Sequence, residues 1–171
     1  LYKEVRDTFS RKTETIAKQA FPVIKNVFEQ RGEMFKNIVV PFTDGKRAYN
    51  VVANLEKTYK SEGEELIRAY EKSIMLAHID DAWKEHLREM DDLKQSVQNA
   101  TYEQKDPLLI YKFESFNLFK SMVDKINKNV VSTLMKGQIP FEAPEEVKQA
   151  EEKRTDLSKM RTGRSDGPAA Q

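Results

Sequence analysis

The sequence predicts a mostly α-helical protein, in which a long antiparallel two-helix hairpin is joined to a smaller helical unit that contains one β-hairpin. Apolar residues recur every three or four positions through residues 62–98 and again through 107–136, which is the spacing of one helical face. The polar link between them, residues 99–106, is so short that the two helices must fold back on one another. Asp44-Gly45 separates two runs of alternating apolar residues, which is the pattern of a β-hairpin.

Residues 3–31 are expected to form the first helix, because their apolar side chains fall on one face. These side chains are Val5, Phe9, Ile16, Ala20, Ile24, Val27 and Phe28. Pro22 lies inside the pattern. Proline lacks the backbone donor and clashes with the preceding turn, so Pro22 should either kink the helix or start a second one. Arg31-Gly32 is a suitable end for the helix.

The β-hairpin is expected at about residues 36–53. Its apolar alternation consists of Ile38, Val40 and Phe42 before the turn, and Tyr49 and Val51 after it. A two-residue Asp44-Gly45 loop, with positive φ at both residues, would pair Val40 with Tyr49 and Ile38 with Val51. Pro41 cannot donate to a ladder, so its strand should be an edge strand. Two strands alone are only marginally stable, and the hairpin should therefore lie against the helices.

A short helix is expected next, with Asn54 as its N-cap and Lys60 near its end. Ser61 and Glu64 then have the spacing of a capping box, which predicts the start of the first arm of the long hairpin. The apolar residues of this arm are Leu66, Ile67, Tyr70, Ile74, Ile79, Trp83, His86, Leu87, Met90, Leu93 and Val97. Because Gly63 weakens a helix, we place a domain boundary there, with a continuous bent helix as the alternative.

The second arm begins with Asp106 as N-cap and Pro107 at the first helical position. Its apolar residues are Leu109, Phe113, Phe116, Phe119, Val123, Ile126, Val130 and Leu134. We interpret the three phenylalanines as core residues rather than a base-stacking surface, because no basic groove accompanies them. Gly137 is expected to end the helix in the left-handed conformation, and Pro140 prevents its continuation. Residues 137–171 are polar and read as a flexible linker.

Composition excludes several classes of function. The 171 residues have a net charge of +1, which favours neither nucleic acid nor an acidic membrane as partner. With no cysteine, the chain has no disulfide, thiolate metal site or cysteine nucleophile. No apolar run approaches the roughly 20 residues that span a bilayer. Phosphate-binding glycine motifs and a nucleophile elbow are also missing from the sequence.

The two histidines of the sequence, His78 and His86, are candidate site residues. His78, Asp81 and Glu85 share one helical face, but a helix-bundle metal site needs further ligands from a facing helix, and the second arm has no histidine. A solvated or salt-bridged face is the favoured interpretation, with a metal-dependent helical enzyme as the competing hypothesis. His86 lies beside the apolar stripe and is expected to be partly buried and hydrogen-bonded.

Tyr102 stands apart from these residues, because it lies in a polar loop at the end of a long hairpin. It could fold back onto the helix ends. It could instead be an exposed contact residue, whose ring is apolar and whose hydroxyl forms hydrogen bonds. Such a side chain can grip varied polypeptides without reading their sequence.

Several stretches of the hairpin resemble the SecA family of bacterial preprotein-translocase ATPases. They are Leu76-Ala-His-Ile-Asp-Asp-Ala-Trp-Lys-Glu-His-Leu87, Met90-Asp91 with Leu93, Tyr102-Glu-Gln-Lys-Asp-Pro107 and Tyr111-Lys-Phe-Glu-Ser-Phe116. The likeness identifies residues 62–136 with the C-terminal half of the helical scaffold domain, including its two-helix finger. Residues 1–61 resemble the end of the helical wing domain.

The resemblance implies a mechanical role without catalysis in this chain. In the family, the finger loop enters the mouth of the SecY channel and contacts the preprotein, a role that falls on Thr101, Tyr102, Glu103, Gln104 and Lys105. The implied partners are the preprotein, the SecYEG channel and the motor domains of the parent chain. A homodimer is also compatible with the resemblance, and nucleic acid is not expected as a partner. ATP and magnesium would belong to the motor domains, and zinc to a cysteine-rich tail. The implied location is cytoplasmic, peripheral on the inner face of the cytoplasmic membrane.

The hairpin is also implied to restrain ATP hydrolysis by the parent until preprotein and channel are engaged. A generic helical interaction or dimerisation module is the alternative function, since it would have the same apolar stripes.

Overall fold

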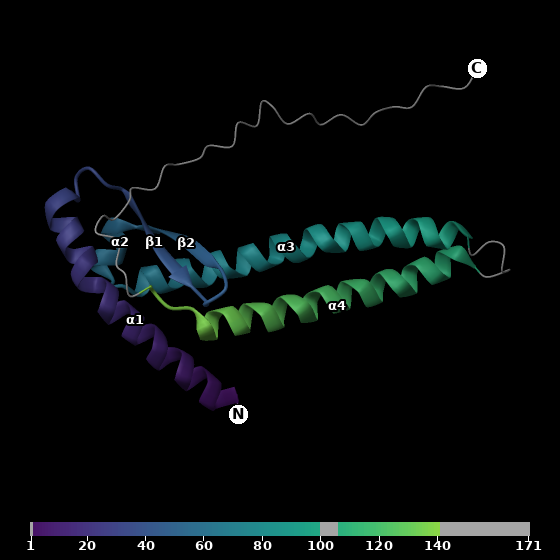
Figure 1. Ribbon diagram of the computed structural model, residues 1–171, viewed down its shortest axis with the longest axis horizontal. Helices are drawn as coiled ribbons and strands as arrows, with labels where there is room; N and C mark the ends of the chain where they lie inside the picture. The colour runs from purple at the N-terminus through teal and green to yellow at the C-terminus, as the bar shows by residue number, and fades with distance from the viewer. Residues whose placement is uncertain (1, 100–105, 141–171) are drawn as a thin grey trace, which may run out of the picture.

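A computed structural model of the chain describes residues 2–99 and 106–140, with the side chains of residues 98 and 99 left aside. Its elements follow the order α1 (Tyr2–Arg31), β1 (Asn37–Thr43), β2 (Ala48–Asn54), α2 (Leu55–Lys60), α3 (Glu64–Asn99) and α4 (Pro107–Lys136). Helices α3 and α4 lie side by side and extend away from the other elements, which gather at the opposite end (Figure 1). The predicted fold class is confirmed.

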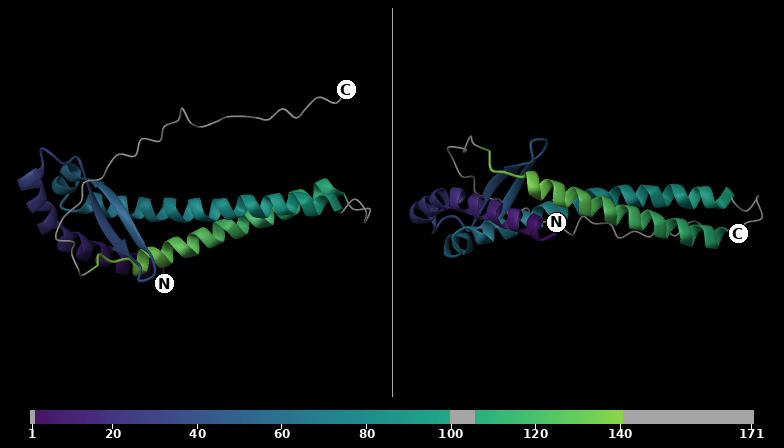
Figure 2. Two further views of the ribbon diagram at one scale, coloured as in Figure 1. Left: turned by 45° about the horizontal axis from the view of Figure 1, so that its top comes forward. Right: turned by 90° about the horizontal axis from the view of Figure 1, so that it is seen from below.

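The β-hairpin lies across the beginning of α3, as the rotated views show (Figure 2). Its strands are antiparallel, and the register pairs Ile38 with Ala53, Val40 with Val51 and Phe42 with Tyr49. The predicted register was therefore wrong by two residues. Such a shift leaves every side chain on its expected face of the sheet, because the strand period is two.

The turn explains the error in register. It has four residues, closed by a hydrogen bond from the amide of Asp44 to the carbonyl of Arg47 at 3.3 Å. Only Gly45 has positive φ, at 85°. Oδ1 of Asp44 accepts hydrogen bonds from the amides of Lys46 at 2.9 Å and Arg47 at 2.8 Å. The aspartate side chain thus stabilises a wider turn than the two-residue loop that Asp-Gly suggests.

Most helix boundaries agree with the capping signals, but Ser61 is the C-cap of α2 and not the predicted N-cap of α3. Helix α1 runs unbroken through Pro22 and ends at Arg31. Oδ1 of Asn54 accepts from the amide of Lys57 at 2.9 Å, so Asn54 caps α2 as predicted. Helix α3 begins two residues later than expected, because Glu62 and Gly63 both have positive φ, at 50° and 98°.

One hydrophobic core joins α1, the β-hairpin, α2 and the first three turns of α3. Its buried residues are Ile16, Ala20, Ile24, Ile38, Phe42, Val51, Ala53, Leu55, Leu66, Tyr70 and Ile74. The rings of Phe42 and Tyr70 stack with centroids 4.3 Å apart. This core holds the base of the long hairpin. Beyond it, α3 packs against α4 and also contacts the β-hairpin through His78 and Asp81.

The end of α4 differs from the prediction. Gly137 has φ −59° and ψ 136°, which is not left-handed, so the predicted left-handed stop is wrong. Glycine is required here for space instead. A Cβ on residue 137 would lie 1.8 Å from the hydroxyl oxygen of Tyr70.

The buried face of α4 does not coincide with the predicted apolar stripe. Met122 and Thr133 are buried, whereas Phe113, Phe116 and Phe119 are exposed, at 65%, 66% and 49%. The interpretation of these phenylalanines as core residues was wrong. A pair of helices can bury only the side chains between them, and α4 has more apolar residues than this interface accommodates.

Candidate functional site

The predicted contact loop, Thr101, Tyr102, Glu103, Gln104 and Lys105, lies outside the described residues. The structure gives the helix ends that flank it. Helix α3 ends at Asn99 and α4 begins at Pro107, both at the end of the hairpin remote from the sheet (Figure 1). Oδ1 of Asp106 accepts from the amides of Leu108 at 2.9 Å and Leu109 at 3.4 Å, which confirms the predicted N-cap.

One side of the hairpin is an apolar face. We define it by residues whose helical spacing places them together, namely Ile79, Trp83 and Leu87 on α3 and Phe116, Phe119 and Val123 on α4. All six are exposed, between 37% and 66%. Helical monomers seldom expose so many large apolar side chains together, and such a surface marks an interaction site.

His86 lies beneath the apolar face. It is 6% exposed, and its ring centroid lies 5.6 Å from that of Trp83 and 6.1 Å from that of Phe119. Its Nδ1 has no hydrogen-bonding partner among the described residues. The expected burial is confirmed, but the expectation of a fully hydrogen-bonded ring was wrong.

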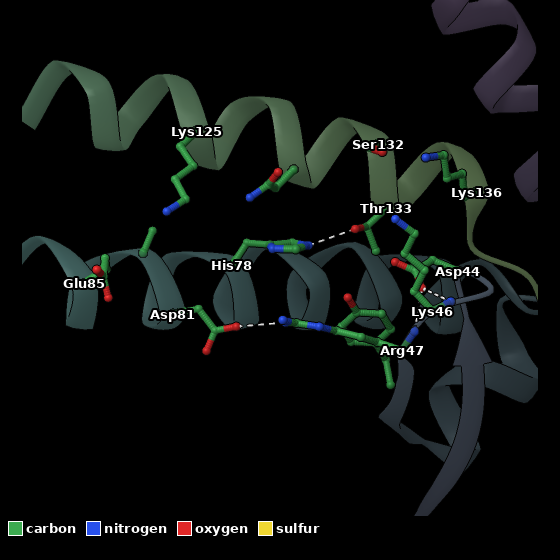
Figure 3. A pocket seen from close by; sticks show the side chains of 13 residues that line it. Asp44, Lys46, Arg47, His78, Asp81, Glu85, Lys125, Ser132, Thr133 and Lys136 are labelled. Atoms are coloured by element: carbon green, nitrogen blue, oxygen red, sulfur yellow. Dashed lines mark hydrogen bonds and ion pairs between the residues drawn. The ribbon is translucent and has the colours of Figure 1, made fainter.

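The other side of the hairpin has a polar cleft of about 420 Å³, formed by the β-turn, α3 and α4 (Figure 3). Arg47 of the turn and Asp81 of α3 form an ion pair at 3.1 Å. Nε2 of His78 lies 2.9 Å from Oγ1 of Thr133 on α4. Glu85 pairs with Arg88 at 2.9 Å.

The metal hypothesis has no support in this arrangement. His78, Asp81 and Glu85 each interact with a different partner rather than with a common point. Among the described residues, no group of three histidine, cysteine or carboxylate side chains is placed to hold a metal ion. The salt-bridged interpretation of this face is the one that the contacts support.

The last turn of α4 is bound to α1, β1 and α3 by contacts that we call the base contacts. Nζ of Lys12 donates to the carbonyls of Leu134 at 3.1 Å and Met135 at 2.6 Å. The hydroxyl of Tyr70 donates to the carbonyl of Thr133 at 3.1 Å. The two Lys12 bonds satisfy carbonyls that a helix C-terminus leaves without partners. The Tyr70 bond is a second one to the Thr133 carbonyl, which also accepts from the amide of Gly137 at 2.8 Å.

A backbone bridge completes the base contacts. Thr43 of β1 and Gln138 exchange two hydrogen bonds, at 2.8 and 2.9 Å. Burial lowers the pKa of Lys12 and raises the pKa of Tyr70 to about 12. Together the base contacts fix one end of α4 to three other elements, so the hairpin is anchored at its base.

None of the base contacts was foreseen in the sequence. Lys12 is one of many lysines, and its position on the inner side of α1 has no distinctive signature. Tyr70 was recognised as an apolar stripe residue, but its hydroxyl partner lies 63 residues away.

The family relationship follows from comparison with known proteins. Residues 1–138 match the family model described as the SecA wing and scaffold domain. The chain belongs to the SecA family. It is 56% identical over 149 residues to a protein of Phocaeicola vulgatus called protein translocase subunit SecA, covering 87% of this chain and 14% of that protein.

Other SecA proteins give the same result. The chain is 56% identical to that of Bacteroides thetaiotaomicron, over 91% of this chain and 15% of the relative. It is 47% identical to that of Porphyromonas gingivalis strain W83, over 100% of this chain and 16% of the relative. The chain therefore spans about one seventh of the length of these relatives. No solved structure matches it.

The match assigns the described elements to the SecA wing and scaffold region. No helix among residues 2–99 and 106–140 is both long and apolar enough to cross a bilayer.

Proposed function

We propose that this chain is the wing and finger part of a SecA protein motor, and that its hairpin presents Tyr102 to a preprotein at the SecY channel. Residues 1–61 form the wing, 62–136 the scaffold with its finger, and 137–171 a linker. The observation that supports this most is the long α3–α4 hairpin, anchored at its base and extending alone toward the loop. Its 36-residue α3 would be about 54 Å long at about 1.5 Å per residue.

The base contacts support a mechanical role for the hairpin. Lys12, Thr43 and Tyr70 come from three elements and converge on the last turn of α4 and the two residues after it. A helix end held by buried contacts opens less readily than a free one, so the end of α4 would move together with the elements that hold it. Movement of the wing and movement of the loop are therefore coupled in this proposal.

The apolar face is the surface on which the remaining domains of the motor would pack. The chain spans 12–16% of its relatives, so most of the longer protein lies outside it. Through this face, the hairpin would restrain ATP hydrolysis until preprotein and channel are engaged. In this proposal, ATP and magnesium bind to those other domains, which carry out the hydrolysis. Zinc would bind to a further tail of the longer protein. This chain would contribute no catalytic residue.

The preprotein, the SecYEG channel and the motor domains are the partners in this proposal. The motor would be cytoplasmic and peripheral on the inner face of the membrane. A generic dimerisation module is the second candidate function, because the exposed apolar face could equally pair two copies of the chain. Sedimentation of the chain distinguishes the two: a monomer at all concentrations argues against dimerisation.

The proposed loop function is tested with Tyr102→Gly in the longer translocase. Translocation of a preprotein into channel-containing vesicles should fall severalfold, while helical content measured by circular dichroism stays the same. Tyr102→Phe is the matched control, since it keeps the ring and should retain most of the activity if apolar contact dominates. Wild-type translocation by Tyr102→Gly would refute the role of this residue.

A further inference from the structure

The polar cleft between the β-turn, α3 and α4 lies on the side of the hairpin opposite the apolar face, and the proposed function makes no use of it. Its walls come from three separate elements, which converge only in the folded chain (Figure 3). Lys46 and Arg47 come from the turn, His78 from α3 and Lys136 from the last turn of α4.

Every acidic side chain of the cleft has a partner. Asp44 accepts from two amides of its own turn, and these hydrogen bonds, with a further contribution from the charge of Lys136, lower its pKa. Asp81 pairs with Arg47, and Glu85 pairs with Arg88. The carboxylates are thus occupied within the chain.

The lysines of the cleft are not balanced in this way. Within the part of the chain that the structure describes, Lys46, Lys125 and Lys136 form no ion pair or hydrogen bond through their side chains. Lys125 and Lys136 are eleven residues apart on α4, which is about 16 Å along the helix. The lysines are therefore spread along the cleft, and two of them, Lys46 in the turn and Lys136 at the end of α4, come from the elements at one end of it.

Neutral donors line the same cleft. The hydroxyl of Tyr49 is buried in the cleft wall and has no partner among the described residues. The ring of Tyr49 lies 6.5 Å from that of His78, and Ser132 lines the same cleft. A buried hydroxyl without a partner costs free energy, which a ligand with acceptor oxygens would recover.

The C-terminus of α4 would ordinarily disfavour an anion in this place, because its carbonyls carry partial negative charge. Here those carbonyls already accept from Lys12 and Tyr70. The base contacts therefore reduce the repulsion at the end of the cleft where Lys46 and Lys136 lie.

We propose that this cleft binds a small multivalent oxyanion of the phosphate class. Lys46 and Lys136 would neutralise its charge, while Tyr49 and Ser132 donate hydrogen bonds to its oxygens. Lysine and hydroxyl groups together are suited to phosphate oxygens, and the volume of about 420 Å³ accommodates a diphosphate as well as a monophosphate. Bound ligand would bridge the β-turn and α4, and so add to the attachment of the hairpin to the wing.

The test is isothermal titration calorimetry of the 171-residue chain with inorganic pyrophosphate and inorganic phosphate in a chloride buffer. We expect saturable binding of one pyrophosphate, with phosphate weaker. Lys46→Ala and Lys136→Ala should each weaken binding about tenfold, and Tyr49→Phe severalfold. Lys120→Ala is the matched control, because Lys120 is an exposed lysine of α4 outside this cleft, and it should change binding less than twofold.

Three outcomes would overturn the proposal. They are no saturable binding at millimolar pyrophosphate, an equal loss with Lys120→Ala, or binding of a short polyglutamate peptide but not of pyrophosphate. The second would indicate diffuse attraction, and the third an acidic polypeptide as ligand. None of these outcomes depends on Tyr102, so the cleft and the proposed translocase function are tested separately.

Discussion

The hydroxyl of Tyr70 occupies the space where a side chain on residue 137 would be. Tyr70 is 1% exposed, and an added Cβ at Gly137 would lie 1.8 Å from its oxygen and 2.8 Å from the ring carbon that bears it. The same hydroxyl donates to the carbonyl of Thr133 at 3.1 Å. The hairpin is thus closed at its base by a tyrosine of α3 in close contact with the chain just beyond α4.

This contact predicts a specific coupling between two substitutions. Gly137→Ala should lower the free energy of unfolding by about 1–3 kcal/mol, because the new methyl group overpacks a filled site. Tyr70→Phe should cost about 1 kcal/mol through its lost hydrogen bond. In urea denaturation the double variant should be less destabilised than the sum of the two, since removing the oxygen relieves part of the clash. Additive effects would contradict the contact.

Tyr70 also predicts a dependence on alkaline pH. Burial first, then the charges of Asp44 and Tyr49, raise its pKa to about 12 in the folded chain, from 10.0. The folded state therefore holds this proton more tightly than the unfolded state does. The contribution of this group to the free energy of unfolding should be fully present below pH 10 and should be lost as the pH rises from about 10 to 12. Urea denaturation across this range should show a steeper loss in the wild type than in Tyr70→Phe, and equal slopes would refute the assignment.

Lys12 is predicted to hold the last turn of α4. Lys12→Ala removes both of its hydrogen bonds to the carbonyls of Leu134 and Met135, and should cost about 1–3 kcal/mol. Hydrogen exchange of the Gly137 amide, which donates to Thr133, should accelerate more than exchange in the middle of α4. Lys18→Ala is the control, because Lys18 is an exposed lysine of the same helix. Equal effects of the two would contradict the role of Lys12.

The division of α4 into a buried and an exposed apolar face predicts losses of stability of very different size for two apolar side chains of this helix. Phe116 is 66% exposed, so Phe116→Ala should change the free energy of unfolding by about 0.5 kcal/mol or less. Met122 is 8% exposed, so Met122→Ala should cost about 2–5 kcal/mol. The measurement is thermal or urea denaturation of the chain. A larger loss for Phe116→Ala would restore the interpretation of Phe116 as core.

Local signals in the sequence predicted most of the fold. Asp106, Pro107 and Asn54 were recognised because a cap depends on the few residues beside it. The predicted length of the β-turn was wrong because the side chain of Asp44 stabilises a wider turn. Gly137 was correctly predicted to follow the end of α4, but the predicted left-handed conformation was wrong. Its actual constraint comes from Tyr70, which is distant in the sequence.

The candidate site was less predictable than the fold. Periodicity identified apolar positions on α4 but could not show which of them face α3, so exposed phenylalanines were assigned to the core. The cleft combines Lys46, His78 and Lys136 from three elements, and no spacing in the sequence brings them together. Thr101–Lys105 remain a prediction from family resemblance.

The most direct measurement for the central claim is site-specific crosslinking from position 102 in the longer translocase, with a preprotein stalled in the channel. A photoreactive residue at position 102 should crosslink to the preprotein in the presence of ATP, whereas the same residue at exposed position 128 on α4 should not. Crosslinking at both positions alike, or at neither, would contradict a hairpin that presents this loop to the moving polypeptide.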